Sequence, residues 1–117
     1  MNQTQEDTIS FDDFLKVDVR VGRIVDVRQF PVARKPAYQL EIDFGAGVGR
    51  KRSSAQLTQR YSAEDLLGRL VLAVVNFPPR QIGSFFSEVL VLGVPDVDSN
   101  VVLVQPEAEV PIGGRLF

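Results

Sequence analysis

The sequence between residues 17 and 27 reads VDVRVGRIVDV and decides the fold class. Valines occupy the odd positions 17, 19, 21, 25 and 27, and this period of two predicts a β-strand. Gly22 and the shift of the apolar pattern to Ile24 interrupt the alternation, which indicates a β-bulge or a sharp bend. Small barrels need such a bend where one strand serves two sheets. We therefore expect a coiled first strand of a barrel.

Further strands are predicted downstream of this stretch. Residues 38–44 alternate apolar side chains at even positions, whereas residues 70–75 and 89–92 are continuous apolar runs, which are typical of central strands. Residues 101–104 follow the turn-rich segment 95–100 and should form the second half of a hairpin. The chain should thus contain several short strands joined by tight turns.

Two short helices are indicated by capping patterns. Ser10 is followed three residues later by Asp13, and Ser62 by Asp65. Each serine can therefore be the N-cap of a helix, with the aspartate at position N3 completing a capping box. Gly68 can end the second helix. Strands with a short helix between the third and the fourth match an all-β fold, the five-stranded Greek-key barrel of the oligonucleotide/oligosaccharide-binding (OB) class.

The length of 117 residues fits one domain, with hydrophobic residues at 44% and charged residues at 24%. We expect a flexible N-terminal segment over residues 1–8 and a single OB-fold domain, with N- and C-terminal extensions, over residues 9–117. The polar start lacks the pattern of a signal peptide, and the longest apolar run is far shorter than the roughly 20 residues that cross a bilayer. A cytoplasmic protein without membrane insertion is predicted.

Cysteine and histidine are absent from the sequence, which excludes disulfides, Cys nucleophiles and His-based catalysis. The carboxylate pairs Asp12/Asp13 and Asp96/Asp98 stand at a helix start and in a turn, where aspartate is favoured for backbone reasons. We therefore predict no enzyme activity, no metal site and no cofactor.

Charge is segregated along the chain, although the net charge is only −2. Residues 19–85 carry eleven basic and five acidic residues, and both ends are acidic. The densest basic clusters are Arg50–Lys51–Arg52 and Arg34–Lys35, which are either a polyanion-binding face or a solvated strand edge. The sequence pI of about 5.1 argues against a dedicated high-affinity nucleic-acid binder.

Residues 76–88 read NFPPRQIGSFFSE and combine helix- and strand-breaking residues with aromatics. Two prolines and a glycine predict an irregular segment, yet it is too apolar for an ordinary solvent loop. The aromatics either plug the barrel or a subunit interface, or they line an adaptable apolar groove for unfolded chain segments. For the groove we predict the peptide-binding residues Phe77, Arg80, Gln81, Phe85 and Phe86.

Five segments carry a resemblance to a known family: residues 9–22, 33–38, 53–56, 73–82 and 87–93. The first resembles the start of the tRNA-binding-domain family related to the C-terminal appendix of bacterial methionyl-tRNA synthetases. The other four are similar to the CsaA subfamily, known as secretion-related chaperones. The resemblance implies an OB-fold homodimer that binds unfolded or export-bound polypeptides, with an ancestral tRNA-binding surface. It also makes the protein-export motor and tRNA candidate partners.

The resemblance also implies a nucleic-acid-binding surface. The residues of this sequence that match the family's positions on that surface are Arg34, Lys35, Arg50, Lys51, Arg52, Ser54 and Gln56. In tRNA-binding relatives the loop after the Asn76 position carries additional Lys and Arg and leads into a Ser-x-Gly-Met signature. Here that loop has Pro78, Gln81 and Gly83, followed by SEVL at residues 87–90. Apolar surface has replaced positive charge, which favours a dimeric chaperone for polypeptides over the alternative, a structure-selective tRNA-binding protein.

Overall fold

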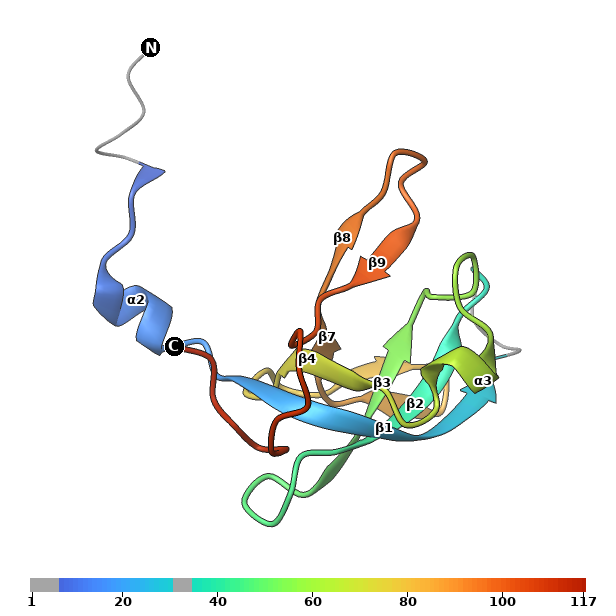
Figure 1. The fold of residues 1–117 in the computed structure, drawn as a ribbon, viewed down its shortest axis with the longest axis horizontal. Coiled ribbons are helices and arrows are strands. Elements are labelled where there is room, and N and C mark those ends of the chain that lie inside the picture. The colour runs from blue at the N-terminus through green and yellow to red at the C-terminus, as the bar shows by residue number, and fades with distance from the viewer. Residues whose placement is uncertain (1–6, 31–34) are drawn as a thin grey trace.

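A long strand, β1 (Val19–Gln29), lies at the centre of a nearly closed antiparallel barrel in the computed structural model, which describes residues 7–30 and 35–117 (Figure 1). The sheet has the order β3-β2-β1-β4-β7. Its other strands are β2 (Tyr38–Asp43), β3 (Arg50–Ala55), β4 (Leu70–Val74) and β7 (Leu90–Val91). The all-β OB-type barrel predicted from the sequence is confirmed.

The bend in β1 is a β-bulge, as the sequence predicts. The pairing of β1 with β2 shifts register between Ile24 and Asp26, and the first half of β1 pairs with β4. A Cβ atom on Gly22 would lie 2.5 Å from Cγ2 of Ile42 and 2.6 Å from Cε1 of Phe44. Glycine therefore lets the strand pass directly against the core at this point.

Both predicted helices are present and each has a complete capping box. In α2 (Phe11–Leu15) the Ser10 hydroxyl accepts the Asp13 N–H, and the Asp13 carboxylate accepts the Ser10 N–H. Ser62 and Asp65 repeat this arrangement in α3 (Ala63–Leu66), and Gly68 follows with a φ of 86°. These local bonds begin the helices where the sequence predicts them.

One small hairpin corrects the predicted elements, and a second confirms the hairpin expected around the turn at residues 95–100. Within residues 76–88, which the sequence predicts to be irregular, β5 (Arg80–Ile82) and β6 (Phe85–Ser87) pair across a tight turn, and residues 76–79 lack regular structure as expected. The run 89–92 is not a full central strand. The strand β7 contains only Leu90 and Val91, and Leu92 adds a backbone hydrogen bond to Leu72 of β4 (2.9 Å). The chain then leaves the sheet at β8 (Gly93–Pro95), which pairs with β9 (Val101–Leu103) in the hairpin that projects from the barrel in Figure 1.

The core lies inside the barrel and is built from the inward faces of its strands. Its main cluster comprises Ile24, Tyr38, Leu40, Ile42, Phe44, Leu57, Leu66, Val71, Ala73, Val89 and Leu103. A second, smaller cluster contains Phe30, Ala37 and Phe85, with Ile82 packed against it. This smaller cluster anchors the β5–β6 hairpin to the barrel.

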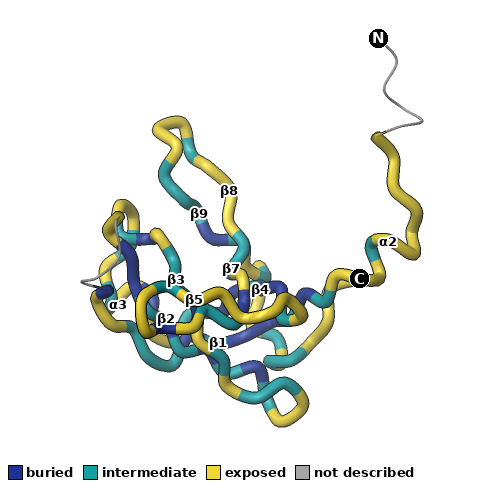
Figure 2. Tube along the Cα trace, turned by 180° about the vertical axis from the view of Figure 1, so that it is seen from behind, coloured by how far each residue is buried: buried dark blue, intermediate teal, exposed yellow. Residues whose placement is uncertain are grey.

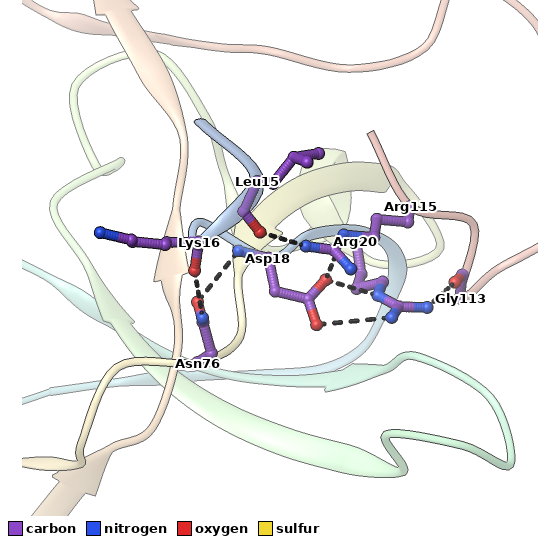
Figure 3. A network of polar contacts seen from close by, with 7 residues as sticks. All are labelled: Leu15, Lys16, Asp18, Arg20, Asn76, Gly113 and Arg115. Atoms are coloured by element: carbon purple, nitrogen blue, oxygen red, sulfur yellow. Dashed lines mark hydrogen bonds and ion pairs between the residues drawn. The ribbon is translucent and has the colours of Figure 1, made fainter. Parts of the chain in front are cut away.

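The segment that leads into β1 is hydrogen-bonded to the residues after β4 and to the C-terminal tail. The Asn76 side-chain amide donates to the Lys16 carbonyl (2.7 Å), and its carbonyl accepts the Asp18 N–H (3.1 Å) (Figure 3). On the other side, Arg115 lies 3.5 Å from the Asp18 carboxylate and donates to the Leu15 carbonyl at 2.7 Å. The network in Figure 3 thus joins the segment after α2, the end of β4 and the C-terminal tail.

The C-terminal tail is hydrogen-bonded to the first part of β1, which does not pair with β2. Val21 donates to the Gly114 carbonyl and accepts the Gly113 N–H, and the Leu116 N–H donates to Val19. The C-terminal extension expected from the sequence therefore satisfies backbone groups of the barrel itself.

Exposed residues dominate α2 and the tip of the β8–β9 hairpin, and buried ones follow β1, β2 and β4 (Figure 2). No helix within the described residues is long and apolar enough to span a membrane.

Candidate binding groove

An open groove of about 900 Å³ lies where the β5–β6 hairpin meets the ends of β2 and β3. Its walls come from four separate parts of the chain: the approach to β2, the end of β3, the segment 77–82 and the segment 87–90. The lining residues are Lys35, Ala37, Ser54, Gln56, Phe77, Pro78, Arg80, Ile82, Ser87, Glu88, Val89 and Leu90. Apolar side chains make up half of this set, with polar and charged groups among them.

The hairpin presents one face to this groove and the other to solvent. Arg80 pairs with Ser87, and Gln81 with Phe86, so the two pairs lie on opposite faces of the hairpin. Arg80 and Ser87 line the groove, whereas the ring of Phe86 is exposed. The alternation of the two strands therefore decides which side chains a ligand in the groove could touch.

Phe85 fastens the hairpin to the barrel. Its side chain is buried, and its ring packs edge-on against Phe30 with centroids 5.2 Å apart. The Arg52 guanidinium lies over the same ring, 5.3 Å from its centroid. The ring is part of the smaller core cluster and does not line the groove.

Side-chain and backbone groups of the 87–89 segment close the barrel beside the groove, at the edge of β3 that does not pair with β2. The Arg52 N–H donates to Glu88 Oε1 (2.9 Å), and the Glu88 N–H donates to the Arg52 carbonyl (2.8 Å). The Ser54 N–H donates to Ser87 Oγ (3.0 Å), and buried Ser53 donates to the Val89 carbonyl (3.1 Å). These bonds hold the groove wall in place and satisfy β3 backbone groups.

The groove unites two residue sets that the sequence analysis assigned to different ligands. Of the predicted peptide-binding residues, Phe77 and Arg80 line it, whereas Gln81 donates to the Gly83 carbonyl in its own turn. Of the predicted nucleic-acid-binding residues, Lys35, Ser54 and Gln56 line it. Arg34 lies outside the described residues.

The basic run Arg50–Lys51–Arg52 is not one continuous basic face. Lys51 stands opposite Ile42 on the inward side of β3, and its two neighbours point outward. Arg50 lies 3.4 Å from the Glu41 carboxylate, and Arg52 lies 3.9 Å from that of Glu88. Strand alternation and acidic partners thus divide and partly neutralise the cluster.

The sequence analysis missed most of the apolar lining, namely Ala37, Pro78, Ile82, Val89 and Leu90. Ser87 and Glu88 also line the groove and are not among the predicted site residues. The sequence does contain one indication of their role, because Ser87 and Glu88 are polar residues directly between two apolar runs. Polar side chains in such a position can accept hydrogen bonds from the backbone of a neighbouring strand, as Ser87 and Glu88 do from β3.

The Asp13, Asp65 and Asp96 carboxylates bind backbone N–H groups at helix starts and in a turn, as predicted. The Ser10 N–H lowers the pKa of the Asp13 carboxyl below its usual range, and the Ser62 N–H does the same for the pKa of Asp65. The backbone N–H of Asn100 is the largest cause of the lowered pKa of Asp96, which organises the β8–β9 turn. No group of three or more potential metal ligands occurs among residues 7–30 and 35–117.

A second surface of interest gathers exposed apolar side chains from both ends of the described chain. We call it the terminal apolar surface; it consists of Ile9, Phe11, Leu15, Val17, Leu116 and Phe117. The C-terminus lies beside α2 in Figure 1, and the Arg115–Leu15 hydrogen bond joins the two segments. Large exposed apolar surfaces of this kind mark protein contacts.

Comparison with known proteins gives consistent matches. The family model of the putative tRNA binding domain matches residues 19–115. The methionine–tRNA ligase of Thermococcus onnurineus is 38% identical over 108 residues, which are 92% of this chain but 14% of the ligase. The chain spans only about a seventh of the length of the curated ligases that it matches.

Two solved structures match over nearly their whole length. The chaperone CsaA of Bacillus anthracis has 50% sequence identity and a TM-score of 0.86, with 94% of this chain and 99% of that chain covered. The CsaA chaperone protein of Picrophilus torridus has 47% identity and a TM-score of 0.87, with 94% and 100% covered.

Proposed function

Because this chain belongs to the putative tRNA binding domain family, in the branch that contains the CsaA chaperones, we propose that it is a non-catalytic chaperone that binds unfolded or export-bound polypeptides as a homodimer. The protein-export motor stays a predicted partner, and the cytoplasm a predicted location.

The observation that carries this proposal is the composition of the groove. It is open, about 900 Å³ in volume, and lined by Phe77, Pro78 and Leu90 together with exposed polar groups. Apolar residues that would ordinarily be buried are held accessible here because Pro78 and Pro79 keep the approach to the hairpin out of the sheet. A segment of unfolded chain can bury apolar side chains against them.

Phe77 and Phe86 provide a matched test. Both rings are exposed, at 52% and 42%, but only Phe77 lines the groove. In titrations with a fluorescently labelled, permanently unfolded polypeptide, Phe77→Ala should weaken binding about tenfold, which corresponds to about 1.4 kcal/mol. Phe86→Ala should bind as the unchanged protein does. Equal affinities of all three proteins would contradict the groove as the polypeptide site.

A second candidate function is tRNA binding, favoured by Lys35, Ser54 and Gln56 in the same groove. A phosphate bound near Lys35 would occupy space that a polypeptide needs. If this function holds, unlabelled tRNA should displace the labelled polypeptide, and Lys35→Glu should weaken the tRNA complex and reduce its salt dependence. Charge reversal at Arg50, Lys51 and Arg52 tests the other predicted cluster. A tRNA affinity far below the affinity for polypeptide in the same buffer would contradict tRNA binding, and the chaperone function would then be the one candidate left.

A further inference from the structure

The groove carries a net positive charge that the rest of the described surface does not share. Most basic residues of the described chain have a carboxylate within 4.0 Å; those are Lys16, Arg20, Arg23, Arg28, Arg50, Arg52, Arg60 and Arg115. Lys35, Lys51, Arg69 and Arg80 have no such partner among the described residues, and two of them, Lys35 and Arg80, line the groove.

The acidic residue in the groove does not cancel this charge. The Glu88 carboxylate accepts the backbone N–H of Arg52 and lies 3.9 Å from Nε of the same residue. Its negative charge is thus already matched by a neighbour outside the groove lining. Lys35 and Arg80 are both exposed, so their charges face whatever enters.

Apolar contact and positive charge occur side by side in the groove. Arg80 and Ile82 are two residues apart on β5 and share one face, while Lys35 precedes the buried Ala37 on the facing wall. A ligand that buries apolar side chains here brings its flanking residues toward the two cations. Carboxylates at those flanks would complement the charges, whereas ammonium groups would be repelled.

From these placements we infer that the groove selects apolar polypeptide segments flanked by acidic residues and discriminates against segments flanked by basic ones. This inference rests on the proposed chaperone function, because it names the class of segment that the same groove takes. Lys35 and Arg80 are the residues that determine the selectivity.

The test uses three labelled peptides with one common apolar centre and flanks of two Glu, two Ser or two Lys. The unchanged protein should bind the Glu-flanked peptide about tenfold more tightly than the Lys-flanked one at about 50 mM salt, with the Ser-flanked peptide between them. The difference should shrink at about 500 mM salt, because the screening length falls to a few ångströms.

Charge reversal identifies the residues responsible. The Lys35→Glu/Arg80→Glu variant should invert the order of the three peptides. The control, Arg28→Glu/Arg60→Glu, makes the same change in net charge at two exposed residues outside the groove lining and should preserve the order. Circular dichroism and thermal melting establish that each variant is folded before its affinities are compared.

The outcomes separate the inference from the proposed function. Equal affinities for all three peptides, or tighter binding of the Lys-flanked one, would overturn the charge selectivity. The groove itself would still stand if Phe77→Ala weakened binding of the Ser-flanked peptide. If Phe77→Ala changed nothing and the control variant inverted the order as well, the proposed site would fail together with the inference.

Discussion

Gly22 is the residue at which β1 comes closest to the core. A side chain there would meet Ile42 and Phe44 at less than 3 Å, and both of these residues are fully buried. Tightly packed cores accommodate additional atoms only by shifting side chains or backbone. The absence of a Cβ is therefore a packing requirement at this position and not a requirement for an unusual backbone angle.

Gly22→Ala should lower the free energy of unfolding by about 1–3 kcal/mol, because the added methyl group overpacks the barrel. Urea denaturation monitored by circular dichroism measures this difference. Gly47→Ala is the matched control, since a Cβ atom on Gly47 would have no neighbour within 4 Å and the backbone angle there is ordinary. Equal stability of the two variants would contradict the close packing at Gly22.

Phe85 and Phe86 are adjacent but have opposite environments. Phe85→Ala should cost about 3–5 kcal/mol because it removes a buried ring from a small cluster. Phe86→Ala should change stability by no more than about 0.5 kcal/mol, as for other exposed positions. Thermal melting measures both, and Phe85→Leu provides a milder change if Phe85→Ala does not fold. A larger loss for Phe86→Ala would reverse the assignment of core and surface.

At the scale of elements, the capping boxes make α2 and α3 sensitive to acid. The serine N–H donors lower the pKa values of Asp13 and Asp65 below the ordinary aspartate value of 3.8. A lowered folded-state pKa contributes stability above the unfolded-state value, and this contribution is lost as the pH falls through the folded-state pKa.

The free energy of unfolding should therefore decrease as the pH falls from about 5 to about 2, and Asp65→Asn should reduce this decrease. Urea denaturation across this range gives the slope. Glu107→Gln serves as the control, because its side chain makes no hydrogen bond within residues 7–30 and 35–117. A slope that Asp65→Asn leaves unchanged would show that the α3 cap does not contribute to the acid sensitivity.

At the scale of the whole molecule, the terminal apolar surface is an apolar feature that the rest of the described chain leaves exposed. Phe11 and Phe117 are 70% and 106% exposed, although the polar network of Figure 3 holds their segments close to β1. A twofold-symmetric partner would cover this surface on both copies and place two grooves in one assembly, which raises the affinity for a long client.

Sedimentation equilibrium should therefore give twice the chain mass of 13.0 kDa at micromolar concentration. Phe11→Asp should shift the protein to the monomer, because it places a charge within the proposed interface. Val97→Asp alters an apolar side chain that is even more exposed than Phe11, at the tip of the β8–β9 hairpin, and should stay dimeric. A monomeric unchanged protein would refute the predicted homodimer.

The sequence by itself determined the elements of this protein whose causes are local. Ser10 and Ser62 cap helices through bonds to residues three positions away, and the alternation of residues 38–44 produces a strand with one buried face. Such features depend on neighbours in the chain, so the OB-type barrel could be predicted before any coordinates were known. The interruption at Gly22 likewise indicated the bend in β1.

Only the tertiary structure decided which side chains form the groove. Lys35, Ser54 and Arg80 are far apart in the sequence, and they meet because the 87–89 segment closes the barrel against β3. The same closure buries Phe85 beside Phe30 and leaves Phe86 exposed. Burial and charge pairing depend on strand register and on long-range contacts, and neither composition nor local pattern contains that information.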